Sequence, residues 1–106
     1  MSLTETTTAD GLVFRGILRE VSQSKNAEGA YLPFGRATFS TEKGTTRINI
    51  QEVLRHPMGD IPLQAFSKLI NAQPGSAWEL VVFAEPTIYN GKPYVNITAT
   101  DAFTLD

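Results

Sequence analysis

The segment DIPLQAFSKLINAQPG, residues 60–75, decides the fold that the sequence predicts. Its apolar residues recur at the spacing of one face of an α-helix, which predicts a short helix over residues 61–72. Asp60 is the expected N-cap, and Pro62 is tolerated because the first helical turn has no acceptor for its missing amide hydrogen. The helix is expected to end at residues 73–75. The apolar face comprises Leu63, Phe66, Leu69 and Ile70.

Segments with the character of β-strands lie on both sides of this helix. They cover residues 12–21, 31–41, 45–53, 77–89 and 92–105. In the third segment Ile48 and Ile50 alternate with polar residues, the pattern of a half-buried strand. Gly16 interrupts the first segment, so a bulge or a sharp bend is expected there. Asn90 and Gly91 join the last two segments, and this pair favours a tight hairpin turn.

Three strands, one helix and two strands is the element order of the oligonucleotide/oligosaccharide-binding (OB) fold, a five-stranded Greek-key barrel. We therefore predict an all-β fold with one short helix between the third and fourth strands. A small α+β sheet with a helix on one face is the alternative that this order leaves open. Residues 1–10 are polar and threonine-rich and are interpreted as a flexible N-terminal tail. Residues 11–106 are interpreted as a single OB-fold domain.

Composition restricts the classes of function. The 106 residues are 42% apolar and 19% charged, which is typical of a globular protein. There is no cysteine and one histidine, His56, so neither a metal site nor another cofactor is expected. No apolar run is long enough to cross a bilayer, and residues 1–10 lack the features of a secretory signal. The prediction is a cytoplasmic protein without membrane or small-molecule partners.

Catalytic residues are not apparent in any recognisable arrangement. The chain has no nucleophile with a partner base in a known context and no glycine-rich loop for phosphate. His56 precedes Pro57 in a connecting segment and has no partner to orient it, so we interpret it as a surface or capping imidazole. The sequence therefore predicts a protein that is not an enzyme.

Basic and aromatic residues gather at the places where an OB fold binds its ligand. Residues 11–100 carry nine basic and seven acidic residues, although the net charge of the chain is -2. Single-stranded nucleic acid is bound by a basic groove with aromatic rings on which bases stack. In an OB fold the second and third strands form this groove, between the first–second and fourth–fifth loops. The candidate binding residues are Lys25, Tyr31, Phe34, Arg36, Arg47, Tyr89, Lys92 and Tyr94.

Several aromatic residues have a structural alternative. Phe34 and Phe39 point to opposite faces of a regular strand, and we assign Phe34 to the groove and Phe39 to the core. Tyr89 and Tyr94 either stack on bases or stabilise their hairpin by a cross-strand contact. Trp78 lies on the apolar face of its strand and is assigned to the core. Packing roles are also assigned to Phe14, Phe66, Phe83 and Phe103.

Two arginines of the first strand are left outside the predicted site. Arg15 and Arg19 share a face with Val13, Ile17 and Val21, which indicates a mixed surface near the bend at Gly16. Positions on the first strand of an OB fold often lie away from the groove. We therefore do not count either arginine among the binding residues.

Together these features resemble the small OB-fold single-stranded-DNA-binding proteins that bacteriophages and mobile elements encode. The resemblance covers residues 11–105 and is carried by the element order and by WELVVFAEPTIYNGKPYVNITATDAF, residues 78–103. It implies non-specific binding of single strands during replication or recombination, often with dimerisation or cooperative coating. By position it points to Arg36 and Arg47 on the sheet and to Tyr89, Lys92 and Tyr94 on the hairpin that joins the last two strands.

The functional hypothesis is non-catalytic, largely sequence-independent binding of single-stranded DNA through aromatic stacking and phosphate contacts. Binding of RNA and formation of a homodimer are left open by the sequence. The alternative is a protein–protein interaction or assembly module on the same barrel, with the exposed tyrosines as interface anchors.

Overall fold

The computed structural model describes residues 4–8 and 11–105, with side chains from residue 12 onward. Its elements are β1 (Thr4–Thr8), β2 (Gly11–Lys25), β3 (Tyr31–Thr41), β4 (Gly44–Gln51), β5 (Val53–Leu54), β6 (Ile61–Pro62), α1 (Ala65–Leu69), β7 (Ala77–Tyr89) and β8 (Lys92–Leu105). The segment interpreted as a flexible tail, residues 1–10, includes β1, which pairs with the start of β2. Residues 1–3, 9, 10 and 106 lie outside the described residues, so the tail stays a prediction.

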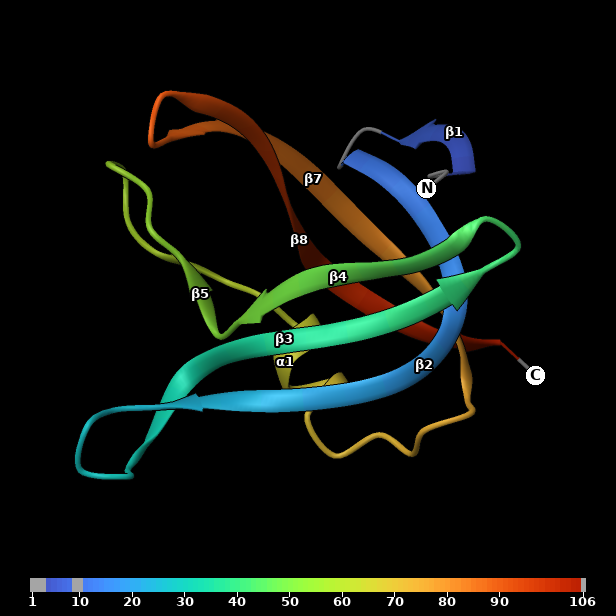
Figure 1. Ribbon diagram of the computed structural model, residues 1–106, viewed down its shortest axis with the longest axis horizontal. Helices are drawn as coiled ribbons and strands as arrows, with labels where there is room; N and C mark the ends of the chain where they lie inside the picture. Colours follow the sequence, from blue (N-terminus) through green and yellow to red (C-terminus); the bar gives the residue numbers. More distant parts are fainter. Residues whose placement is uncertain (1–3, 9–10, 106) are drawn as a thin grey trace.

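Five of the described strands close into a barrel (Figure 1). The antiparallel pairs are β2–β3, β3–β4, β7–β8 and β2–β7. The parallel pair β4–β8, joined at Asn49 and Thr98, completes the order β2-β3-β4-β8-β7 and back to β2. The structure confirms the predicted all-β OB-fold barrel with its helix between the third and fourth barrel strands. The alternative α+β sheet is wrong.

β2 belongs to both sides of the barrel because it changes partner along its length. Its first half, to Ile17, pairs with β7, and its second half, from Ile17 to Lys25, pairs with β3. The change of partner follows Gly16, where the sequence predicted a bend. An added Cβ at Gly16 would lie 3.1 Å from Phe39 Cβ and equally near Ser40 O, so the absent side chain allows the close crossing.

The helix is shorter than the sequence predicts. α1 begins after Gln64, which is its N-cap, so the prediction of Asp60 as N-cap is wrong. Ile61 and Pro62 are extended and form β6, which pairs with β5. Two causes favour the extended backbone here: a residue before proline avoids the helical region, and the Leu63 amide donates to Glu52 O at 2.9 Å.

The apolar face predicted for the helix is nevertheless buried. Leu63, Phe66 and Leu69 are buried, and Ile70 packs against the same core. α1 contacts β3, β4 and β8, and Figure 1 shows it behind β3. The pattern therefore identified buried residues correctly, although only some of them lie in a helix.

Large apolar side chains fill the barrel. Phe14 and Phe39 meet edge to face with ring centroids 5.7 Å apart, and both are fully buried. Trp78 is buried, and its Nε1 donates to Ser76 Oγ at 2.8 Å, which confirms its assignment to the core. The remaining fully buried large side chains are Leu18, Ile48, Ile50, Leu69, Leu80 and Val82.

The packing role predicted for Phe103 is wrong, because its side chain is 45% exposed on the outside of the barrel. A β-bulge explains this difference. Asp101 pairs with Val81 and Ala99 pairs with Val82, so Thr100 is an extra residue in β8. The extra residue reverses the alternation of inward and outward side chains beyond it. Ala102 consequently points into the core, and Phe103 points outward.

Candidate nucleic-acid interface

The outer face of β3 and β4 carries a row of polar, basic and aromatic side chains. The cross-strand pairs on this face are Phe34 with Gln51, Arg36 with Asn49, and Thr38 with Arg47. Phe34, Arg36 and Arg47 are exposed, while the alternate residues Ala37, Phe39, Ile48 and Ile50 are buried. The structure therefore confirms the predicted register, with Phe34 outside and Phe39 in the core.

Gly35 fixes the backbone geometry between Phe34 and Arg36. An added Cβ at Gly35 would lie 2.1 Å from Ser22 O and 2.9 Å from Gln23 Cα, so only glycine fits against the backbone of β2. A register shift between Gln23 and Lys25 follows this close approach. A cavity of about 160 Å³ lies beside it, lined by Phe34, Arg36, Asn49 and Gln51 among others.

The finger, defined as residues 84–96 of the β7–β8 hairpin, projects beyond the barrel (Figure 1). All of its residues are exposed. Asn90 and Gly91 have φ values of 51° and 75°, the positive angles that a type I′ turn requires. The hairpin predicted from this dipeptide is therefore confirmed.

The two faces of the finger differ in chemistry. Because directly paired residues share a face, three pairs form a polar, aromatic face of the finger: Glu85 with Asn96, Thr87 with Tyr94, and Tyr89 with Lys92. The rings of Tyr89 and Tyr94 lie 6.4 Å apart with an interplanar angle of 59°. The opposite face carries only apolar side chains. Its members are Ala84, Pro86, Ile88, Pro93 and Val95.

The polar face of the finger meets the sheet at Arg36. A cavity of about 390 Å³ is lined by Arg36, Thr87, Tyr89, Tyr94, Val95 and Asn96. This volume falls in the range of roughly 300–1,000 Å³ that is typical of ligand pockets. Arg36 also lines the smaller cavity beside Phe34, so one guanidinium borders both.

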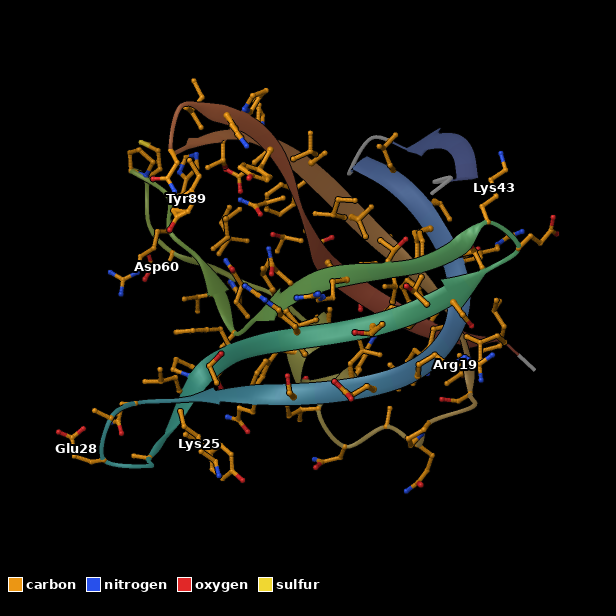
Figure 2. All side chains as sticks on the ribbon, in the orientation of Figure 1. Arg19, Lys25, Glu28, Lys43, Asp60 and Tyr89 are labelled. Atoms are coloured by element: carbon orange, nitrogen blue, oxygen red, sulfur yellow. The ribbon has the colours of Figure 1, made fainter. Side chains whose placement is uncertain are left out.

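Lys25 and Tyr31 lie together at the end of the β2–β3 hairpin. Lys25 Nζ stands 4.8 Å from the centroid of the Tyr31 ring, a cation–π contact. The turn between them is held by Asn26, whose Oδ1 accepts hydrogen bonds from the amides of Glu28 and Ala30. Figure 2 shows Lys25 and Tyr89 on two separate projections of the barrel. Neither Lys25 nor Tyr31 lines the two cavities around Arg36.

Ion pairing separates the predicted binding cations from three other basic residues, Arg15, Arg55 and Lys68. The ion pairs within the described part of the chain are Arg15–Glu79 at 2.8 Å, Arg55–Asp60 at 4.0 Å and Lys68–Asp101 at 2.7 Å. Among the described residues, no carboxylate lies within 4.0 Å of any of the four predicted cations. These cations are Lys25, Arg36, Arg47 and Lys92. Their charges are therefore not neutralised by a described neighbour.

Three residues of the finger cavity are absent from the sequence prediction, and they are Thr87, Val95 and Asn96. Thr87 and Asn96 both line the cavity, and Asn96 Nδ2 donates to Thr87 Oγ1 at 3.0 Å. The signal that could have found Thr87 and Asn96 is strand alternation, since each lies two residues from a predicted tyrosine. Val95 lies on the opposite face of the finger, and alternation gives no signal for it. The site residues of the sequence prediction are thus divided among three places: the sheet, the finger and the β2–β3 turn.

Within residues 12–105, no group of three or more histidine, aspartate and glutamate side chains is placed to hold a metal ion. His56 lies in an exposed turn, where its Nδ1 accepts a hydrogen bond from the Met58 amide at 3.0 Å. In the described part of the chain no helix is long and apolar enough to span a membrane.

Comparison with known proteins gives no relative on which this interface could be aligned. No protein-family model matches the chain, and no curated protein or solved structure matches it significantly. What can be inferred about function therefore comes from the side chains and cavities of the chain itself.

Proposed function

We propose that this protein binds single-stranded DNA without catalysis and largely independently of sequence. The observation that carries the proposal is the cavity at which Arg36 of the sheet faces Tyr89 and Tyr94 of the finger. One guanidinium and two aromatic rings at a single cavity can contact a phosphate and the adjoining bases at once. Service in replication or recombination, as in bacteriophage proteins of this kind, is part of the same proposal.

Aromatic exposure favours single strands over duplexes. Tyr89 and Tyr94 are 61% and 50% exposed, and Phe34 is also exposed beside its own cavity. A ring can stack only on a base whose face is free, and the bases of a duplex already stack on each other. Stacking requires no particular base because every base has a π-face, so weak sequence preference follows.

Phosphate contacts come from four of the cations that lack a described carboxylate partner. Arg36 and Arg47 stand on the sheet, while Lys92 lies on the finger and Lys25 on the β2–β3 turn. The two lysines flank the sheet on separate projections, in the positions of the loops that border an OB-fold groove. Single-stranded RNA presents the same phosphates and base faces, so it is the competing nucleic acid to test.

A second candidate function, a protein interaction or assembly module, is favoured by the apolar face of the finger. Ile88 and Val95 are 77% and 65% exposed, and their neighbours Pro86 and Pro93 carry no charge. Contiguous exposed apolar surface commonly marks a site for another protein, and a second copy of this chain is one such partner.

A titration with oligo-dT at two salt concentrations tests the main proposal. Four phosphate-binding cations give a slope of log K against log salt of about -3, at about -0.7 per contact for single strands. A duplex of equal length is the control and should bind more weakly, while oligo-U measures the preference between DNA and RNA. Absence of binding at low salt refutes the proposal. Concentration-dependent self-association in its place would support the assembly module.

A further inference from the structure

A further cavity, of about 610 Å³, lies away from the finger, at the end of β3 near Thr41. Its lining includes Arg15 and Arg19 of β2, together with Ser40 and Glu42. Figure 2 shows Arg19 at the end of the barrel opposite to Tyr89 and Lys25. The sequence prediction left both arginines outside the binding site.

We propose that Arg19 binds a phosphate of the same single strand, so that the interface extends along β3 from the finger to this cavity. The inference rests on the proposed function and adds a binding residue to it. The ligand class is a phosphodiester group of a strand already held by the finger and the sheet.

Continuity of the outer face supports this extension. Along β3 the outward residues Arg36, Thr38 and Ser40 are two positions apart, which is about 7 Å per step in a strand. Thr38 pairs with Arg47 of β4, and Ser40 Oγ accepts a hydrogen bond from Arg19 Nε at 2.8 Å. Arginines from three adjacent strands therefore stand at three successive levels of one surface.

A bulge in β2 explains why Arg19 points to this surface. Leu18 pairs with Phe39 and Glu20 pairs with Thr38, so Arg19 is the extra residue between two regular pairs. Bulges redirect a side chain and are common beside functional sites. Leu18 remains fully buried, while Arg19 is exposed.

Charge distinguishes Arg19 from the other arginine of the cavity. Arg15 Nε contacts Glu79 Oε1 at 2.8 Å, which neutralises part of its charge. Arg19 has no carboxylate within 4.0 Å among the described residues, and its only described side-chain partner is the neutral Ser40. Glu20 pairs with Thr38 and therefore shares its outer face, and Glu42 lines the cavity. Both carboxylates weaken the attraction for an anion, but neither lies within 4.0 Å of Arg19. Its terminal nitrogens are thus available to an external anion.

The experiment compares Arg19→Gln with the unmodified protein on oligo-dT of about 4 to 16 nucleotides, the range of site sizes of OB folds. We expect equal affinity for the shortest strands, which reach only the finger and Arg36. For the longer strands we expect the affinity to fall about three- to tenfold and the salt slope to weaken by about 0.7. Arg19→Lys, which keeps the charge, should recover most of the affinity for longer strands.

Lys68→Gln is the matched control, because it removes the same charge from α1, behind β3. It should leave binding unchanged at every length. An Arg19→Gln protein that binds all lengths as tightly as the unmodified protein refutes the extension while leaving the proposed function intact. An equal loss at all lengths also refutes it, since the effect would then not depend on reaching the cavity. If no oligonucleotide binds the unmodified protein, the proposed function and this inference fail together.

Discussion

Replacement of Tyr89 and Tyr94 by alanine, singly and together, separates a binding role of the finger from a structural one. Both rings lie on the polar face of the finger and border the cavity with Arg36. A base that stacks on either ring loses its platform in the variant. The structural alternative is the cross-strand contact between the two rings, which are 6.4 Å apart.

The two roles predict free-energy changes of different size in different measurements. Because at least half of each side chain is already exposed, the loss of the ring contact should reduce the free energy of unfolding by only about 0.5–1 kcal/mol. Loss of stacking should reduce the free energy of DNA binding by about 1–3 kcal/mol per ring. That corresponds to an increase in Kd of roughly 5- to 150-fold for each tyrosine. Because the rings touch, the double variant should deviate from additivity.

The assay is fluorescence-anisotropy titration with oligo-dT, alongside urea denaturation of the same variants. Ile88→Ala is the matched control, since Ile88 lies on the same finger but on its apolar face, away from the cavity. It should leave Kd within about twofold, which is less than 0.5 kcal/mol. If the tyrosine variants bind DNA as tightly as the unmodified protein, or if Ile88→Ala weakens binding equally, stacking on the polar face is refuted.

Three further substitutions test the outer face of the sheet and the turn of the finger. Arg36→Gln should weaken oligo-dT binding about five- to fiftyfold and reduce the dependence of binding on salt. The control Lys68→Gln should change neither the affinity nor the salt dependence. Equal effects of the two substitutions would contradict a specific role for Arg36. Gly35→Ala should reduce the free energy of unfolding by about 1–3 kcal/mol in urea denaturation, because its Cβ would lie 2.1 Å from Ser22 O; unchanged stability would show that β2 and β3 can separate freely. Gly91→Ala creates no such clash, but it forces alanine to adopt a positive φ, which should lower the local stability of the finger by about 1 kcal/mol. This loss should appear as faster hydrogen exchange of the finger amides, and unchanged exchange would count against the type I′ turn.

Much of the site could be predicted because it depends on local rules. Alternation in the third barrel strand placed Arg47 outside and Ile48 inside, and both positions agree with the structure. Alternation also put Phe34 and Phe39 on opposite faces, and Phe34 was assigned to the outer face because it shares that face with Arg36. What the sequence could not show is that Arg36 and the finger share one cavity, since that contact joins residues about fifty positions apart.

The errors in the sequence prediction share one physical cause, which is competition from non-local backbone pairing. The helix was predicted four residues too early because the pattern of buried side chains is similar in a helix and in an irregular connection. The amide of Leu63 instead bonds to Glu52 O, and Ile61 pairs with β5. Phe103 was assigned to the core because a bulge at Thr100 has no signature in the sequence.

The sequence by itself determined the order of the five barrel strands and the helix, the Asn90–Gly91 turn and most of the core, because these depend on local conformational preference and on burying apolar surface. Only the tertiary structure decided where the bulges at Arg19 and Thr100 fall, and with them the outward positions of Arg19 and Phe103. A bulge is fixed by the match between two strands from different parts of the chain, so neither strand specifies it alone. The same holds for the convergence of Arg36 with the finger, which exists only once the barrel has closed.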